Sequence, residues 1–235
     1  MSSLLSDIIA AATNLAWPRT CEVCGCALVK DEDVLCLKCL MGMPMVNLHG
    51  DDFNLLHQRL AGKILFDRVA AMFWYYRDTP YARLIHHAKY DGRPRIGEIL
   101  AARYALKLKN DGFFDGIDAI VPIPLSPLKL LKRGYNQSEA IARGLSRISG
   151  IKTIQGLTTS HYRATQTRRN AYARWLNARN GFTPVAKQLR GLKHILIVDD
   201  VLTTGATILA AAEALHRHDP TVRLSSFTLA ASHLR

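Results

Sequence analysis

The sequence predicts an α/β fold, a parallel sheet flanked by helices, preceded by a small cysteine-rich module. From Ile64 onward, strand-like segments alternate with segments of helical apolar spacing, and this alternation is typical of parallel sheets. The run Ile195–Val198 is wholly apolar, as expected for a strand that is buried on both faces. Residues 18–45 instead contain all five cysteines and show little periodic apolar pattern.

Composition divides the 235-residue chain into three parts. Residues 1–45 hold a mildly apolar start, interpreted as a short amphipathic helix, and the cysteine module. Residues 46–63 are mixed and polar and form a predicted connector, and residues 64–235 form the predicted α/β domain. Hydrophobic residues make up 49% of the chain, which is the composition of a globular protein and not of a disordered one.

No apolar run in the sequence is long enough to span a bilayer. The apolar start has no basic residue ahead of it and contains Asp7, so it does not fit a secretory signal. We therefore interpret this start as a short packing helix and expect a cytoplasmic protein without a membrane span.

Eight segments of the α/β part have a pattern that assigns them to strands or helices. Apolar or β-favouring runs predict strands at Val69–Tyr76, Ala119–Ile123, Ile195–Val198 and Val222–Ala230. Helical spacing predicts helices at Pro80–Tyr90, Ile96–Leu108, Ser138–Ile148 and Ile208–Leu215, with Ser138 as a candidate N-cap.

Two Cys-x2-Cys pairs dominate the first module, with eleven residues between them. Two such pairs close a tetrahedral set of four thiolates, which suits a structural Zn²⁺ and leaves no open coordination position. A disulfide framework or an iron–sulfur cluster are the alternatives, and the absence of a signal peptide disfavours the first. The predicted metal ligands are Cys21, Cys24, Cys36 and Cys39. We interpret Cys26 as a free thiol, with the alternative that it replaces Cys24 as a ligand in a less usual Cys-x-Cys geometry.

The net charge of +12 is concentrated in one part of the chain. Between Asp118 and Asp199 the only acid is Glu139, whereas basic residues are frequent. Such a field attracts phosphate, on nucleotides or on a nucleic-acid backbone. A solvated basic face without a ligand fits the composition equally well.

The string Ile195-Leu-Ile-Val-Asp-Asp-Val-Leu-Thr-Thr-Gly-Ala-Thr207 combines a strand, two acids and small residues that lead into a helix. Small residues let the backbone close around a phosphate, and the amides of a helix N-terminus favour the anion. The acids accept hydrogen bonds from sugar hydroxyls or hold a cation. The string predicts a ribose 5-phosphate site at the carboxyl end of a parallel strand, rather than a threonine-rich helix cap beside two solvated acids. Its candidate residues are Asp199, Asp200, Thr203, Thr204, Gly205, Ala206 and Thr207.

This string resembles the phosphoribosyl pyrophosphate (PRPP) signature of type I phosphoribosyltransferases. Other motifs narrow the resemblance to the ComF family, which includes competence proteins and GntX-like proteins. These motifs are the cysteine ribbon, Lys89-Tyr-Asp-Gly92, Val121-Pro-Ile-Pro-Leu125, Arg133-Gly-Tyr-Asn-Gln137 and a segment that contains Gln166, Arg174, Asn177 and Phe182. The chain departs from the family at Arg163, where a threonine is frequent.

The resemblance implies a type I phosphoribosyltransferase fold that binds PRPP with Mg²⁺. Residues 203–207 then bind the 5′-phosphate, while Asp199 and Asp200 contact the ribose hydroxyls and are the candidate catalytic residues. The loop after the strand at 119–123 faces pyrophosphate. Arg133 and Lys89 are further PRPP ligands by this resemblance, although Arg133 and Gln137 also suit a purely structural role in their loop.

Residues 161–182 are polar, basic and aromatic, and three interpretations remain open. A mobile loop of this kind closes over the substrate in phosphoribosyltransferases. Arginines among aromatic side chains also suit single-stranded nucleic acid, and a surface helix with an aromatic stripe is the third interpretation. The candidate contacts are Arg163, Gln166, Arg168, Arg169 and Arg174.

Two functions follow from these motifs, and they belong to different classes. The resemblance favours a PRPP-binding protein that handles incoming single-stranded DNA in natural transformation, with other DNA-uptake proteins as partners. The alternative is an active enzyme that transfers ribose 5-phosphate from PRPP to a nucleobase-like acceptor, which the sequence does not identify. A structural adaptor that acts through the ribbon alone would leave the phosphate loop unexplained.

Overall fold

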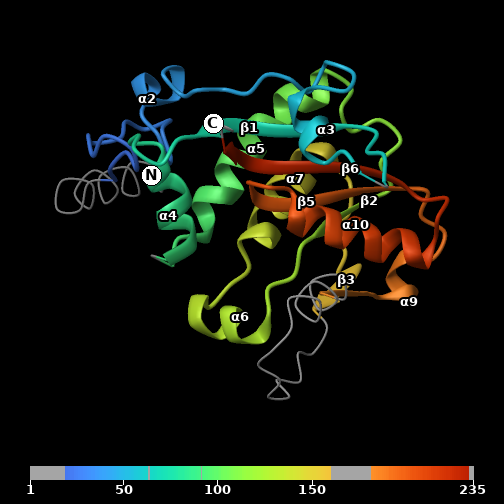
Figure 1. The fold of residues 1–235 in the computed structure, drawn as a ribbon. Helices are drawn as coiled ribbons and strands as arrows, with labels where there is room; N and C mark the ends of the chain where they lie inside the picture. Colours follow the sequence, from blue (N-terminus) through green and yellow to red (C-terminus); the bar gives the residue numbers. More distant parts are fainter. Residues whose placement is uncertain (1–18, 63, 91, 160–180, 233–235) are drawn as a thin grey trace, which may run out of the picture.

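The structure, a computed structural model, describes residues 19–62, 64–90, 92–159 and 181–232. A parallel four-stranded sheet in the order β1-β6-β5-β2 forms its centre (Figure 1). Its strands are β1 (Val69–Tyr75), β2 (Ala119–Pro122), β5 (His194–Leu202) and β6 (Arg223–Ser232). The predicted parallel α/β fold is confirmed.

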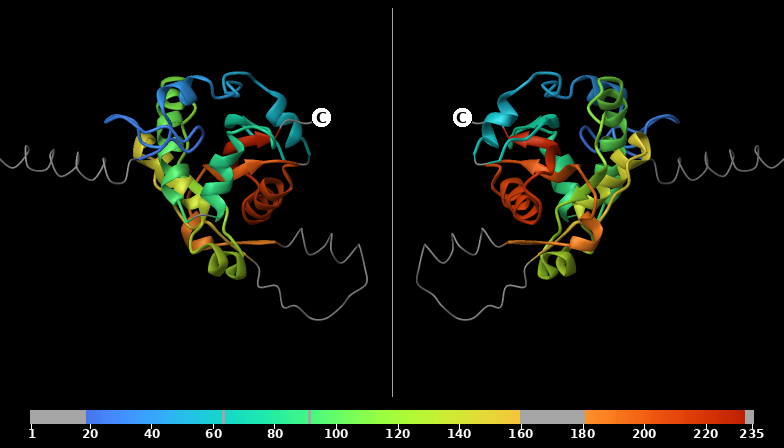
Figure 2. Two further views of the ribbon diagram at one scale, coloured as in Figure 1. Left: turned by 90° about the vertical axis from the view of Figure 1, so that its left-hand side faces the viewer. Right: turned by 90° about the vertical axis from the view of Figure 1, so that its right-hand side faces the viewer.

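Helices cover both faces of this sheet, so the domain has three layers (Figure 2). Leu196 and Val198 of β5 pack on one face, while Ile195 and Ile197 pack on the other, as the alternation of side chains along a strand requires. The first face is covered by α4 (Ala82–Tyr90), α5 (Pro94–Asn110) and α7 (Gln137–Ser149). The second is covered by α3 (Leu55–Arg59) and α10 (Ala206–His218).

The contact between α5 and α7 depends on a glycine. A Cβ atom at Gly144 would overlap the carbonyl oxygen of Glu98 and lie 3.0 Å from the amide nitrogen of Ala102. The missing side chain therefore lets α7 approach the backbone of α5 directly.

Besides α3, five short elements were not predicted, because segments of three to seven residues are too short to show a periodic pattern. Beta strands β3 and β4 form a separate antiparallel pair beside the main sheet. These elements are α2 (Leu37–Met41), α6 (Pro127–Arg133), β3 (Leu157–Thr159), β4 (Phe182–Pro184) and α9 (Ala186–Leu189).

Both edges of the main sheet are covered by short stretches of chain. Met45 pairs antiparallel with Phe73 on β1, and Thr153 pairs parallel with Ile120 on β2. The amide of Trp74 donates to Pro44 at 2.7 Å, and the amide of Ile154 donates to Ile120 at 2.9 Å. These bridges satisfy part of the backbone that an edge strand would otherwise expose.

Several elements begin or end at residues other than those predicted, and two of these differences concern predicted site or cap residues. The strand predicted at Ile195–Val198 continues to Leu202, so the paired acids lie within β5 and not after it, because β6 pairs with it throughout this length. The N-cap of α7 is Asn136, not Ser138, since the Asn136 Oδ1 accepts from the amide of Ser138 at 3.1 Å. The predicted helix at the start of the chain lies outside the described residues.

Every helix in the described ranges is too short or too polar to cross a membrane.

Candidate functional site

A cleft of about 390 Å³ opens beside the last residues of β5, on the side where β2 has ended. Lys89 from the end of α4, the loop after β2, the helix α6 and the start of α7 form its walls. The structure brings together five of the predicted ligand-binding residues at this cleft: Lys89, Arg133, Asp199, Asp200 and Thr207. Residues 203–205 form the adjoining turn between β5 and α10, and Ala206 is the first residue of α10.

The cleft exists because β5 is longer than β2. The last register pair between the two strands is Pro122 with Val198, after which the amide of Ile123 donates to the carbonyl of Val198 at 2.9 Å. Beyond that point β5 continues along β6 alone. Asp199 and Asp200 therefore sit on an interior strand whose other side is open.

The side chain of Asp199 makes one hydrogen bond that a longer β2 would otherwise make. Backbone groups alternate in direction along a strand, so the amide of Asp200 points to the side that Val198 shares with β2. That amide donates to Asp199 Oδ1 at 2.9 Å. The carboxylate thus satisfies a donor that β2 would have satisfied had it continued.

The carboxyl group of Asp199 is held in an environment that disfavours its charge. Burial, and next the neighbouring charge of Asp200, raise its pKa to about 7, although hydrogen bonds from the Asp200 amide and from Ser138 oppose the shift. Ser138 Oγ donates to Asp199 Oδ1 at 3.1 Å. A carboxyl group with such a pKa gains or loses a proton near neutral pH.

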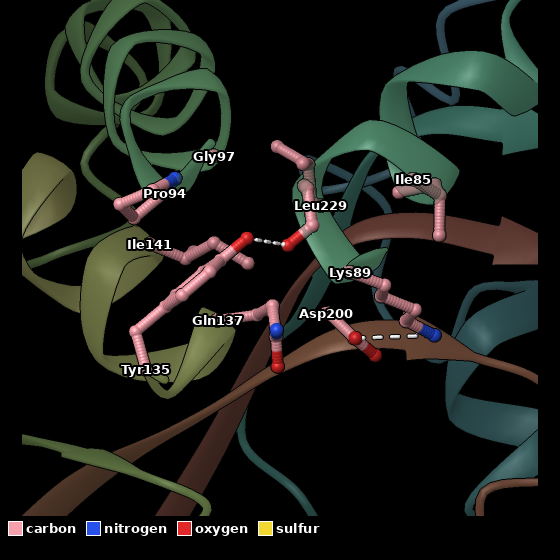
Figure 3. Close-up of a pocket in the computed structure, with 10 residues that line it drawn as sticks. Ile85, Lys89, Pro94, Gly97, Tyr135, Gln137, Ile141, Asp200 and Leu229 are labelled. Atoms are coloured by element: carbon pink, nitrogen blue, oxygen red, sulfur yellow. Dashed lines mark hydrogen bonds and ion pairs between the residues drawn. The ribbon is translucent and has the colours of Figure 1, made fainter. Parts of the chain in front are cut away.

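Asp200 has a cationic partner. Lys89 Nζ lies 3.1 Å from Asp200 Oδ2, and the two side chains are 23% and 17% exposed (Figure 3). Lys89 comes from the last turn of α4, on the opposite side of the cleft from α10. The pair places a positive charge next to two acids, at the wall of the cleft.

The turn between β5 and α10 requires a glycine. Gly205 has φ of +80°, and a Cβ atom there would lie 2.7 Å from Leu60 Cδ2 and 3.1 Å from the carbonyl oxygen of Arg59. Thr203 and Thr204 on one side of it and Ala206 and Thr207 on the other are exposed. The first amides of α10 have no acceptor within the helix, and the amide of Ala206 donates to Thr204 Oγ1 in a long hydrogen bond of 3.4 Å, so an anion could bind at this helix end.

The loop from β2 to α7 is held by its own side chains. Asn136 Nδ2 donates to the carbonyl of Ile123 at 3.0 Å, and Arg133 Nη1 donates to Gln137 Oε1 at 2.9 Å. Arg133 and Gln137 thus have a structural contact with each other, and both also line the cleft. The hydroxyl of Tyr135 donates to the carbonyl of Ala88, which joins this loop to α4.

Ser138 and Lys129 are among the cleft residues that sequence reasoning missed. Ser138 follows the string 133–137 directly and was interpreted only as a cap. Lys129 lies in α6, a helix that the sequence pattern does not predict, so nothing in the sequence indicated that it lines the cleft.

The four predicted metal ligands form one cluster. One sulfur from each of Cys21, Cys24, Cys36 and Cys39 lies within 4.8 Å of the other three, and three of these residues are buried. Cys26 Sγ lies 3.3 Å from Cys24 Sγ at the exposed side of the cluster. Four converging sulfurs are a donor set that fits a tetrahedral ion such as zinc. The predicted four-cysteine ribbon is confirmed.

The predicted contacts at Arg163, Gln166, Arg168, Arg169 and Arg174 lie outside the described residues. Only the flanking residues of that segment are described. Thr159 and Phe182, which pair across β3 and β4, both line the cleft.

Comparison with known proteins connects this cleft to one family. The family described as "Phosphoribosyl transferase domain" matches residues 94–233, a range that includes β2, β5 and the turn before α10. The DNA utilization protein YhgH of Escherichia coli (strain K12) is 30% identical over 202 residues, which cover 84% of each chain. Competence protein F of Haemophilus influenzae is 29% identical and covers 66% of this chain and 61% of its own. Competence protein ComFC of Bacillus subtilis is 32% identical over a match that covers 47% of this chain and 43% of that protein.

Proposed function

Because the chain belongs to the phosphoribosyl transferase domain family, within its ComF branch, we propose that the cleft binds PRPP together with Mg²⁺. The observation that carries this proposal is the position of Asp199 and Asp200 on the open side of β5, directly before the turn at Gly205. A sugar phosphate needs groups that accept hydrogen bonds from its hydroxyls and, a few ångströms away, groups that donate hydrogen bonds to its phosphate. This segment supplies both.

In this proposal each part of PRPP meets a different wall of the cleft. The amides and hydroxyls of residues 203–207 bind the 5′-phosphate at the start of α10. Asp199 and Asp200 accept hydrogen bonds from the ribose hydroxyls. Arg133, Lys129 and Lys89 supply positive charge to the pyrophosphate, which lies against the loop after β2.

Bound Mg²⁺ would neutralise part of the charge on pyrophosphate, and the cleft fits it because carboxylate and phosphate oxygens are the ligands it prefers. The chain itself orients the sugar and excludes water around the anomeric carbon. Fixed carboxylates next to that carbon stabilise the positive charge that develops on the ribose when pyrophosphate leaves. Asp199 holds or releases a proton at Oδ1 or Oδ2, which sets how many hydroxyl donors it can accept.

The biological role that we propose is the handling of incoming single-stranded DNA in natural transformation, with DNA-uptake proteins as partners. Its support is the similarity to proteins named for DNA utilization and competence, and the one-sided basic charge between residues 118 and 199. The second candidate is an active phosphoribosyltransferase with a nucleobase-like acceptor, which the paired acids and basic residues around the cleft favour.

Zn²⁺ is the ion that we propose for the four cysteines, and its role is structural because four sulfurs leave no position for a substrate. We further propose that residues 1–45, 46–63 and 64–235 are the units of the chain. Cys21, Cys36 and Cys39 belong to the same apolar cluster as α5, so the ribbon packs directly on the larger unit.

Calorimetric titration of PRPP in Mg²⁺ tests the proposed ligand. We expect saturable binding, and Asp200→Asn should weaken it at least about tenfold, the loss expected for a charged hydrogen-bond partner. Asp111→Asn, an exposed carboxylate far from the cleft, is the matched control. Failure of the wild-type protein to bind PRPP would overturn the proposal.

The same titration with an oligonucleotide separates the two roles. DNA handling predicts oligonucleotide affinity that falls steeply with salt and is weakened by charge reversal at Arg168 and Arg169, but not by Arg217→Glu on α10. Catalysis predicts pyrophosphate release from PRPP with one of a panel of nucleobases. Oligonucleotide affinity independent of salt would contradict the first role.

A further inference from the structure

The cysteine ribbon contacts α4 through one carboxylate that has no assigned role. Glu22 stands next to Cys21 in the ribbon, and its side chain is only 13% exposed. Its Oε2 accepts from His87 Nδ1 at 2.7 Å, and its Oε1 accepts from Arg93 Nη1 at 2.6 Å. One ribbon residue therefore holds the last turn of α4 and the segment that follows it.

Two other hydrogen bonds hold the beginning of the same helix. Tyr81 donates its hydroxyl to the carbonyl of Cys39 at 2.8 Å, and Arg83 Nη1 donates to the carbonyl of Val23 at 3.3 Å. Cys39 is itself a member of the sulfur cluster. The ribbon thus contacts α4 along its whole length.

The opposite side of α4 reaches into the cleft. Residues 87 and 89 are about 200° apart around a helix of 3.6 residues per turn, so a helix held at His87 by the ribbon presents Lys89 to the other side. Figure 3 shows Lys89 directed at Asp200 and Tyr135 directed at α4, where its hydroxyl meets the carbonyl of Ala88. The helix α4 connects the ribbon to β5 and to the loop after β2.

We propose that Glu22 is a positioning residue, through which the metal-loaded ribbon sets the place of Lys89 in the cleft. The inference rests on the proposed PRPP site. With the ribbon ordered around its ion, α4 is fixed and Lys89 stands opposite Asp200. Loss of the ion, or of the Glu22 carboxylate, releases the end of α4 and removes a fixed positive charge from beside the two acids.

A double-mutant cycle tests whether Glu22 acts through Lys89. The variants are Glu22→Gln, Lys89→Met and the double variant, with PRPP affinity measured by calorimetry in Mg²⁺. We expect each single variant to weaken binding about tenfold, and the double variant to be no weaker than Lys89→Met, which is the signature of coupled residues. Glu22→Gln must also retain its metal by elemental analysis.

Glu98→Gln provides the matched control. Glu98 also meets two cations, Arg143 at 3.4 Å and Arg147 at 3.5 Å, but these ion pairs join α5 to α7 and not to α4. Its effect on PRPP affinity should be small and should add to that of Lys89→Met. Additive effects of Glu22→Gln and Lys89→Met would overturn the inference, because Glu22 would then contribute only general stability.

Hydrogen exchange supplies a measurement that needs no ligand. Glu22→Gln, or removal of the metal from the wild-type protein with a chelator, should speed exchange of the α4 amides while α10 keeps its protection. Unchanged exchange in α4 would refute the linkage. If the wild-type protein does not bind PRPP, the proposed function fails, and the linkage is decided by this exchange measurement alone.

Discussion

Ser138 Oγ donates a hydrogen bond of 3.1 Å to Asp199 Oδ1, although the two residues are 61 positions apart in the chain. The same oxygen accepts the amide of Asp200 at 2.9 Å. One carboxyl group therefore joins the first turn of α7 to the end of β5, at the point where β2 no longer pairs. Both donors favour its charged form, whereas burial and Asp200 disfavour it.

The stability of the protein should depend on pH through Asp199. The carboxyl group titrates near 3.8 in an unfolded chain and near 7 in the fold, so between these values the folded state binds more protons. Its contribution to stability therefore falls as the pH rises through this window. We expect Asp199→Asn to raise the melting temperature relative to wild type more at pH 8 than at pH 5.

Thermal unfolding at the two pH values checks this expectation, and Asp31→Asn at an exposed position is the control. An Asp199→Asn shift that is equal at pH 5 and pH 8 would contradict the raised pKa.

Gly205→Ala should damage the turn before α10 more than its backbone angle alone explains. A left-handed residue other than glycine costs about 1 kcal/mol. At Gly205 the new Cβ would also meet Leu60 Cδ2 at 2.7 Å. Gly150→Ala is a matched control, since Gly150 has φ of +81° and no neighbour within 4 Å. Denaturant unfolding should give the larger loss in free energy of unfolding for Gly205→Ala, and only this variant should weaken PRPP binding. Equal losses would show that Leu60, at the end of α3, moves aside at little cost.

Gly144→Ala should destabilise the protein by about 3 kcal/mol, at the upper end for overpacking, because backbone atoms of α5 cannot give way to the new methyl group. Gly97→Ala lies in the same helix pair, but its Cβ would meet only the side chain of Ile141 at 3.1 Å. A flexible side chain can move, and alanine gains helix propensity of about 1 kcal/mol, so this change should be nearly neutral. Urea unfolding curves measure both variants, and similar losses would show that α5 and α7 are not in fixed contact.

Cys36→Ser should abolish stoichiometric zinc and lower the melting temperature, whereas Cys26→Ser should retain the ion. Cys36 is buried in the cluster and also accepts the Cys39 amide at the start of α2, so its loss affects the ion and the helix. Elemental analysis of the purified variants, with a melting curve for each, decides the matter. Metal loss in Cys26→Ser would show that Cys26 and not Cys24 is the fourth ligand.

The sequence predicted those features that a short stretch of neighbouring residues determines. Four cysteines in two pairs predicted their cluster, and the apolar run before Asp199 predicted a buried central strand, because both signals are local. The length of β5 could not be predicted from its own residues. Its last four residues are strand because β6 pairs with them, and no pattern within 199–202 indicates that partner.

Contacts between distant segments account for what the sequence did not predict in the site. Ser138 meets Asp199, and Glu22 meets His87 and Arg93, only because the fold places α7 and the ribbon there. The role of Asn136 was not predicted either. Its side-chain amide caps α7 through Oδ1 and donates to the carbonyl of Ile123 through Nδ2. Charge and spacing alone give no reason to pair these residues.

The unequal lengths of β2 and β5 give the protein a built-in spectroscopic reporter. The Asp200 amide is a strand amide whose acceptor is a side chain rather than a neighbouring strand. Any molecule that binds the Asp199 carboxylate perturbs this hydrogen bond, so the ¹⁵N resonance of the Asp200 amide should shift on titration. The resonances of the Ile195 and Ile197 amides should not shift. Occupancy could then be followed without a label on the ligand.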